Sequence, residues 1–262
     1  MKAVFFDIDG TLVSLKTGKM ASSTPDAIRQ LRKRGILCFV ATGRSRPEID
    51  DMDMLEGVEF DGILSNNGQY CYRGDTVFYD APIDPTDVAA VVQQAQEMGY
   101  SIWLTEADRI YINLENDRTR EAMRFIHTPI PPVEDIRRAT EHPIYKIVPF
   151  LTPEELHKYP LQVTRNCKTA SWFPLGGDIM PKVGGKAAAI CEVMRRYGIA
   201  QTEIMAFGDG ENDMEMLNLA HVGVAMGNAA QSVKQIADYV TSDCEDDGIY
   251  HALLHYGLID AS

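Results

Sequence analysis

The chain has 262 residues, a length that suits one large domain or two of moderate size. Apolar residues make up 45% and charged residues 24%, so the composition is that of a globular protein and excludes a largely disordered chain. The 25 basic and 38 acidic residues give a net charge of −13, which argues against nucleic acid as a partner because phosphate backbones are bound by Lys and Arg.

Five short apolar runs predict strands that are buried on both faces, as in a parallel sheet covered by helices. Two helical patterns lie near them: one has Thr24 as its N-cap and stops at Gly35, and the other covers residues 187–197 and stops at Gly198. This alternation predicts an α/β, doubly wound, Rossmann-like domain, in which ligands bind outside the carboxyl ends of the strands. The five runs are residues 3–6, 37–41, 62–64, 204–207 and 222–226, and each stops at polar residues.

The middle of the chain has a different order of elements, typical of an α+β domain. Helical spacing near residues 88–95, 118–126 and 153–158 is mixed with strand patterns at residues 101–105, 109–113, 144–150, 161–164 and 170–173. We therefore predict a discontinuous core made of residues 1–81 and 179–262, with residues 82–178 inserted as a second domain.

No segment has the pattern of a signal peptide, and no run approaches the roughly 18 apolar residues that a membrane-spanning helix needs. The five cysteines are widely spaced and include no CxxC pair, so neither a disulfide framework nor a zinc site is expected. These features predict a cytoplasmic protein without a membrane partner. We make no prediction of its oligomeric state.

Two carboxylates, Asp7 and Asp9, stand two residues apart where the first apolar run ends. Both can project into one site if Ile8 turns away, and Gly10 permits a tight turn there. One carboxylate can then attack as a nucleophile while the other carries a proton for the leaving group. The alternative is a simple turn after a strand, since Asp-Gly is a common turn dipeptide.

A second acidic pair, Asp209 and Asp213, follows the fourth apolar run. The two residues are four apart, so they share one face if a helix starts between them. Together with Asp7 they would form an oxygen-rich cluster suited to Mg²⁺, which prefers few carboxylates combined with water and phosphate oxygens. The alternative is that both residues only cap a helix N-terminus.

Two further elements could bind an anion. Thr42, Gly43 and Arg44 follow the second apolar run and offer a hydroxyl group and backbone N–H groups. Lys186 follows a Gly-rich segment at a helix start and could neutralise a phosphate as a point charge. Each element alone is a weak signal, because an isolated lysine is most often a solvated surface group and Lys182 lies only four residues away.

Together these elements resemble the haloacid dehalogenase superfamily of phosphohydrolases. Residues 7–11 match its DxDGT motif and residues 208–213 its GDxxND motif, while Thr42 and Lys186 match the second and third motifs. The inserted domain lies where that family carries its large type-two cap. Residues 67–68 and 226–229 also resemble the Cof-like sugar-phosphate phosphatases within the superfamily. One departure is Ala187, where many relatives have Gly, and we expect no consequence because Ala is a good helix former.

The resemblance implies a role for each of these residues. Asp7 would be the nucleophile that forms a phosphoaspartate, and Asp9 would be the general acid and then the base. Mg²⁺ would be held by the Asp7 carboxylate, the Asp9 backbone carbonyl and Asp209, with Asp213 nearby. Thr42 and Lys186 would bind the phosphoryl group, and the remaining predicted substrate-binding residues are Gly43, Arg44, Asn67 and Asn212.

The predicted function is Mg²⁺-dependent hydrolysis of small phosphate monoesters, with sugar phosphates as the favoured class. A phosphotransferase or mutase on the same scaffold stays open, because these reactions share the phosphoaspartate. A hypothesis from another class is a non-catalytic sugar-phosphate sensor. Loss of Asp9 would support a sensor, and Asp9 is present.

Overall fold

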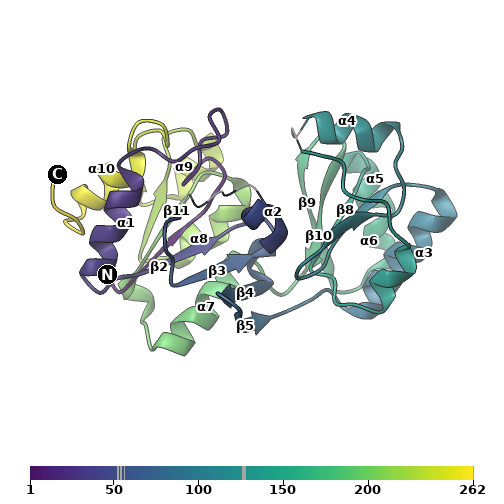
Figure 1. Ribbon diagram of the computed structural model, residues 1–262, viewed down its shortest axis with the longest axis horizontal. Coiled ribbons are helices and arrows are strands. Elements are labelled where there is room, and N and C mark those ends of the chain that lie inside the picture. Colours follow the sequence, from purple (N-terminus) through teal and green to yellow (C-terminus); the bar gives the residue numbers. More distant parts are fainter. Residues whose placement is uncertain (52, 54, 56, 126–127, 262) are drawn as a thin grey trace. The chain divides into compact units, whose positions relative to one another are not determined.

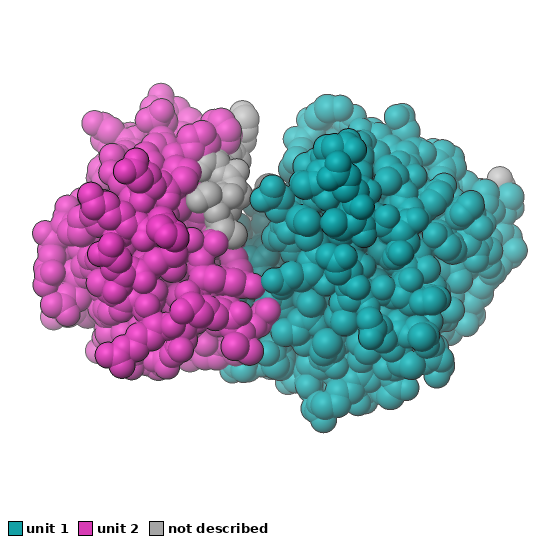
Figure 2. Space-filling model, turned by 180° about the vertical axis from the view of Figure 1, so that it is seen from behind, with its two compact units in different colours: residues 1–44, 48–80, 185–262 teal, residues 45–47, 81–184 magenta. Residues whose placement is uncertain are grey.

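A computed structural model describes residues 1–51, 53, 55, 57–125 and 128–261 of the chain. These residues form two compact units, shown in different colours in Figure 2. The first unit consists of Met1–Arg44, Glu48–Asp80 and Gly185–Ser262, and the second of Ser45–Pro47 and Ala81–Gly184. The predicted boundary between residues 178 and 179 lies within a strand of the second unit, β10 (Gly176–Pro181).

The first unit is built on an eight-stranded sheet (Figure 1). Its strands are β1 (Ala3–Phe6), β2 (Leu37–Ala41), β3 (Gly62–Ser65), β4 (Tyr70–Arg73), β5 (Thr76–Asp80), β11 (Ile204–Gly208), β12 (Val222–Ala225) and β13 (Tyr239–Val240). Their spatial order is β13-β12-β11-β1-β2-β3-β4-β5. The strands from β13 to β3 run parallel, and β4 and β5 extend the sheet in antiparallel fashion. The predicted fold class, α/β with a parallel-sheet core, is confirmed.

Helices cover both faces of this sheet, which explains why its central strands are apolar throughout. α1 (Thr24–Lys33) and α10 (Gly248–His255) pack on one face, together with Phe6 and Phe207. α7 (Lys186–Tyr197), α8 (Met214–Leu219) and α9 (Gln231–Ile236) pack on the other, together with Phe5. Phe5 and Phe6 face opposite cores because side chains alternate along a strand.

The two helices predicted in the first unit are present. Pro25 occupies the first turn of α1, and Ile28 and Leu31 are buried on its inner face. The helix begins at Thr24, with Ser23 in the capping position that the sequence assigned to Thr24. α7 ends at Tyr197, directly before Gly198. Within the described part of the chain, no helix combines the length and apolar character needed to cross a membrane.

The second unit has a five-stranded antiparallel sheet with its own apolar cores. The strands are β6 (Ile102–Thr105), β7 (Ile110–Ile112), β8 (Lys146–Pro149), β9 (Cys167–Phe173) and β10, in the spatial order β7-β6-β8-β10-β9. The helices are α3 (Pro85–Met98), α4 (Asp117–Phe125), α5 (Pro153–Lys158) and α6 (Pro160–Val163). α3, α5 and α6 share a core with one face of the sheet, and α4 packs with the other. The short helix α2 (Arg46–Asp51) contains residues of both units.

One predicted strand of the second unit is wrong. Residues 161–164 were expected to form a strand, but residues 160–163 form the helix α6. Pro160 favours this outcome because its fixed φ suits the first turn of a helix. The hydroxyl group of Thr164 also donates a hydrogen bond to the carbonyl oxygen of Pro160, 3.1 Å away, which closes the turn.

Candidate active site

The predicted site residues of the first unit directly follow the carboxyl ends of neighbouring strands in the sheet. Asp7 follows β1, Thr42 follows β2, and Asp209 follows β11. Because β11, β1, β2 and β3 are adjacent and parallel, their carboxyl ends meet at the same edge. The fold therefore brings together residues that are up to about 200 positions apart in the sequence.

Lys186 is the first residue of α7, and its side chain is fully buried. Its Nζ lies 2.6 Å from Oδ1 of Asp7 and 2.5 Å from Oδ1 of Asp213. Burial by itself lowers the pKa of this ammonium group, but Asp213 and Asp7 raise it more strongly, so the pKa is above its ordinary value. Lys186 is therefore a charged group fixed between two carboxylates, and Lys182 is exposed and bonds the carbonyl oxygen of Arg165.

Asp213 organises the backbone of the loop after β11. Its Oδ2 accepts hydrogen bonds from the backbone N–H groups of Asp209, at 3.0 Å, and Gly210, at 2.9 Å. Its other oxygen accepts the hydrogen bond from Lys186. Since both oxygens of Asp213 have partners, its main effect is to fix Lys186 and the loop that carries Asp209.

Three carboxylates form a cluster that could hold a metal ion. Oxygens of Asp7, Asp209 and Asp213 all lie within 4.8 Å of one another. Burial raises the pKa of Asp209 to about 7, and the charge of Asp213 acts in the same direction. Burial and Asp213 likewise raise the pKa of Asp7 well above its ordinary value. Ionisation of all three carboxylates would leave negative charge in excess of the one lysine, and this all-oxygen donor set fits a hard cation such as Mg²⁺.

Asp209 is held in place by contacts that the sequence did not predict. Its Oδ1 accepts a hydrogen bond from the hydroxyl group of Thr11, 3.2 Å away. The side-chain amide of Asn228 donates to the carbonyl oxygen of Gly10, at 2.7 Å, and lies 3.4 Å from Oδ2 of Asp209. A Cβ atom at position 10 would lie only 2.3 Å from Oδ2 of Asp209, so the close approach of the carboxylate requires glycine there. The sequence feature that could have pointed to Asn228 is its position just after the strand predicted at residues 222–226.

Asp9 points to a different partner from Asp7. Both of its carboxylate oxygens accept hydrogen bonds from the guanidinium group of Arg44: Nε lies 2.9 Å from Oδ2, and Nη2 lies 2.9 Å from Oδ1. The side chains are partly accessible, at 31% for Asp9 and 23% for Arg44. Arg44 was predicted to bind substrate; its guanidinium group contacts the second carboxylate of the motif, and its role toward substrate stays a prediction.

The remaining predicted substrate-binding residues lie in the loops after three strands: Thr42 and Gly43 after β2, Asn67 after β3, and Asn212 after β11. Thr42 is fully buried, and its Oγ1 accepts a hydrogen bond from the backbone N–H of Arg44, 3.1 Å away. The backbone N–H of Asn67 donates to the carbonyl oxygen of Thr42, at 2.8 Å, and Oδ1 of Asn67 accepts from the side chain of Asn212, at 3.2 Å. Gly43 packs against Asn67, because a Cβ at position 43 would lie 3.2 Å from that oxygen. These residues thus form one connected group of loops.

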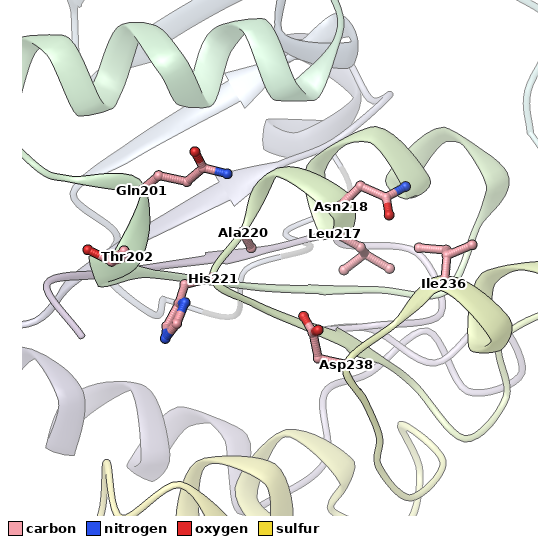
Figure 3. A pocket seen from close by; sticks show the side chains of 8 residues that line it. All are labelled: Gln201, Thr202, Leu217, Asn218, Ala220, His221, Ile236 and Asp238. Carbon is pink, nitrogen blue, oxygen red and sulfur yellow. The ribbon is translucent and has the colours of Figure 1, made fainter.

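A separate surface pocket of about 260 Å³ lies in the same unit (Figure 3). Its lining includes Thr202, His221 and Asp238. His221 directly precedes β12, Asp238 directly precedes β13, and Thr202 lies shortly before the start of β11. These strands are parallel, so the pocket lies at their amino ends, at the opposite edge from Asp7 and Asp209. Oδ2 of Asp238 also accepts a hydrogen bond from the backbone N–H of Gly223, 2.8 Å away. This pocket is therefore not the carboxylate site.

Comparison with known proteins identifies the family. Residues 4–253 match the family model of the haloacid dehalogenase-like hydrolases, so the chain belongs to this family. Its members among solved structures include the HAD subclass IIB sugar phosphatase BT4131, which is 35% identical, with a TM-score of 0.85 and coverage of 99% of this chain and 100% of that one. BT1666 from Bacteroides thetaiotaomicron, a phosphatase of the same superfamily, is 31% identical, with a TM-score of 0.90 and coverage of 99% and 96%.

A curated relative also extends over nearly the whole chain. The 5-amino-6-(5-phospho-D-ribitylamino)uracil phosphatase YitU of Bacillus subtilis (strain 168) is 26% identical over 266 residues, which cover 97% of this chain and 96% of YitU. With the family match, these relatives establish the protein as a phosphatase of the haloacid dehalogenase superfamily, an enzyme that hydrolyses phosphoric monoesters.

Proposed function

We propose that the protein is a Mg²⁺-dependent phosphatase that hydrolyses small sugar phosphates through a phosphoaspartate on Asp7. The observation that carries the proposal is the contact between Lys186 and the Asp7 carboxylate, 2.6 Å apart, next to Asp209. This arrangement combines a nucleophile, a fixed cation and a cluster of metal ligands, which are the parts that phosphoryl transfer needs. The sugar class is supported by BT4131, which is a sugar phosphatase, and by YitU, whose substrate carries its phosphate on a ribityl chain.

The first step forms the phosphoaspartate. A carboxylate oxygen of Asp7 attacks the phosphorus atom of the ester, and the bond from phosphorus to the leaving oxygen breaks. Asp9 gives its proton to this leaving oxygen, so that an alcohol departs rather than an alkoxide. Lys186 neutralises the carboxylate and the approaching phosphoryl oxygens, and the Thr42 hydroxyl group lies on a neighbouring strand end to bind them.

The second step regenerates the enzyme. Asp9, now a carboxylate, removes a proton from a water molecule whose oxygen attacks the phosphorus atom, and the bond between phosphorus and Asp7 breaks. Phosphate leaves, and Asp7 is again a carboxylate. A Mg²⁺ ion bound by Asp7 and Asp209 would neutralise the developing charge on the phosphoryl oxygens in both steps. Asp213 would act through its contacts with Lys186 and with the backbone N–H of Asp209.

The test is phosphate release from a panel of sugar phosphates and other phosphate monoesters, in MgCl₂ and in EDTA. We expect release that requires Mg²⁺ and no acceptor sugar, which separates a hydrolase from a phosphotransferase or mutase. Asp7→Asn should lower kcat by at least a factor of about 10⁴, because the nucleophile is lost. Circular dichroism should show that this variant is folded.

Asp26→Asn is the matched control. Asp26 is an exposed aspartate on α1 that pairs with Arg29, so its loss should leave kcat unchanged. Full phosphatase activity in Asp7→Asn would contradict the phosphoaspartate on Asp7. A wild-type protein that releases no phosphate but binds sugar phosphates would favour the sensor hypothesis.

A further inference from the structure

The guanidinium group of Arg44 fixes the whole carboxylate of Asp9. Two nitrogens of the planar group contact two oxygens of the carboxylate, each at 2.9 Å. This paired geometry sets both the position and the rotation of the carboxylate, which a single ammonium group does not. Each oxygen of the Asp9 carboxylate can accept two hydrogen bonds. Arg44 donates one to each oxygen, so each oxygen keeps one lone pair that can hold the proton to be transferred.

Arg44 is itself held through both its backbone and its side chain. Its backbone N–H donates to Oγ1 of Thr42, at 3.1 Å, and its carbonyl oxygen accepts from the backbone N–H of Asn66, at 2.9 Å. Its Nη1 lies 3.5 Å from Oε1 of Glu48, whose side chain is only 10% exposed. The arginine therefore links the loops after β2 and β3 to the motif after β1.

We infer that Arg44 is a positioning residue for Asp9, and that it acts on proton transfer to the leaving group rather than on phosphate binding. This inference rests on the proposed function, in which Asp9 is the general acid. Lys186, and not Arg44, is the side chain in contact with the nucleophile Asp7. The guanidinium group of Arg44 instead contacts the carboxylate that handles the proton.

The dependence on the leaving group tests the inference. An alkyl phosphate such as glucose 6-phosphate needs a proton on its leaving oxygen, whereas p-nitrophenyl phosphate releases a stable anion. We measure kcat/KM, because it reports only the steps up to departure of the leaving group. In Arg44→Met, kcat/KM for the alkyl ester should fall by about 10²-fold, within the range that general acid catalysis contributes. For the aryl ester it should fall by less than about threefold.

Equal losses of kcat/KM for both esters would overturn the inference, because they would indicate phosphate binding or a general structural defect. Arg32→Met is the matched control: Arg32 is a partly buried arginine of the same unit that pairs with Glu59 at 2.8 Å, outside the site. It should change neither value. Arg44→Lys keeps the charge but loses the paired contact, so it should show the same selective loss and retain thermal stability.

A double-mutant cycle gives an independent test. If Arg44 acts through Asp9, then Arg44→Met should change kcat/KM for the alkyl ester by less than about threefold in an Asp9→Asn background. Losses that multiply would show that Arg44 works separately from Asp9 and would refute the inference. A wild-type protein that is inactive on both esters would instead refute the proposed function.

Discussion

The raised pKa of Asp209 affects the stability of the protein as well as its proposed catalysis. Burial, helped by the charge of Asp213, raises the pKa of its carboxyl group to about 7, against an ordinary value of 3.8. Between these two values the folded, metal-free protein holds a proton that the unfolded chain has released. The free energy of unfolding must therefore fall as the pH rises from about 4 to about 7, and change little above that range. Asp7, whose pKa is also raised, adds a slope of the same sign.

We expect Asp209→Asn to reduce this loss of stability, because the amide carries no titrating proton. The measurement is urea unfolding in EDTA at pH values from 5 to 8, with the exposed Asp26→Asn as the control that keeps the slope. In MgCl₂ the wild-type slope should become shallower or change sign, because the metal binds the ionised carboxylate. A slope in EDTA that is the same in wild type and Asp209→Asn would contradict the assignment.

At the scale of single residues, the sequence located the acidic groups better than their partners. Asp7 and Asp209 directly follow apolar strands, and the ends of parallel strands meet at one edge whatever the loops do. The contact between Arg44 and Asp9 depends instead on the conformations of two loops, which no periodic pattern encodes. The contact of Asn228 with Gly10 has the same character, since the two residues are 218 positions apart.

At the scale of elements, the site depends on how the N-terminus of α7 packs. The 3₁₀ helix η1 (Asn66–Gly68) lies against it, and the φ of Gly68 is +84°. A Cβ at position 68 would lie 2.7 Å from Cβ of Ala189 and 2.8 Å from the carbonyl oxygen of Gly185. Since Lys186 is the next residue after Gly185, any shift of this helix end moves the cation away from Asp7.

We therefore expect Gly68→Ala to lower kcat by about 10²-fold, because a misplacement of about 1 Å can have that effect. Gly74→Ala is the matched control: Gly74 also has a positive φ, +54°, but a Cβ there meets nothing within 4 Å. In both variants the alanine must adopt a positive φ, which lowers the free energy of unfolding by about 1 kcal/mol. Steady-state kinetics should therefore separate the two variants, and equal kcat values in them would argue against the packing explanation.

The elements that the sequence missed share a physical cause. β4 and β5 form a hairpin at the edge of the sheet, and β5, which has no buried residue, contains only three consecutive apolar residues, at positions 77–79. The helix α6 has only four residues, which is too short for a helical period to appear. By contrast, β1, β2 and β11 are apolar and buried throughout almost their whole length, and their positions were predicted correctly.

At the scale of the whole molecule, the two units have separate sheets and separate cores. The three clustered carboxylates all belong to the first unit. A ligand stabilises the structure to which it binds. Bound Mg²⁺ should therefore slow hydrogen exchange in β1, β11 and the loops that follow them, and leave β6 and β8 of the second unit unchanged.

Hydrogen exchange followed by mass spectrometry, in MgCl₂ and in EDTA, measures this difference strand by strand. Asp209→Asn should remove the effect of Mg²⁺ on β1 and β11. Equal protection of both units by Mg²⁺, or protection that persists in the variant, would place the metal elsewhere. The experiment needs no substrate and is independent of the turnover assays.

The central position of β1 also has a consequence for how the chain is made. One neighbour, β2, follows after about 30 residues, but the other, β11, is synthesised almost 200 residues later. At about 5–20 residues per second, a ribosome takes roughly 10–40 s to cover that interval. During most of this time the nascent chain carries Asp7 without Lys186 or Asp209, while the residues of the second sheet are being synthesised. An interrupted translation product therefore lacks the charges that surround the nucleophile, and the site is completed only when the last quarter of the polypeptide leaves the ribosome.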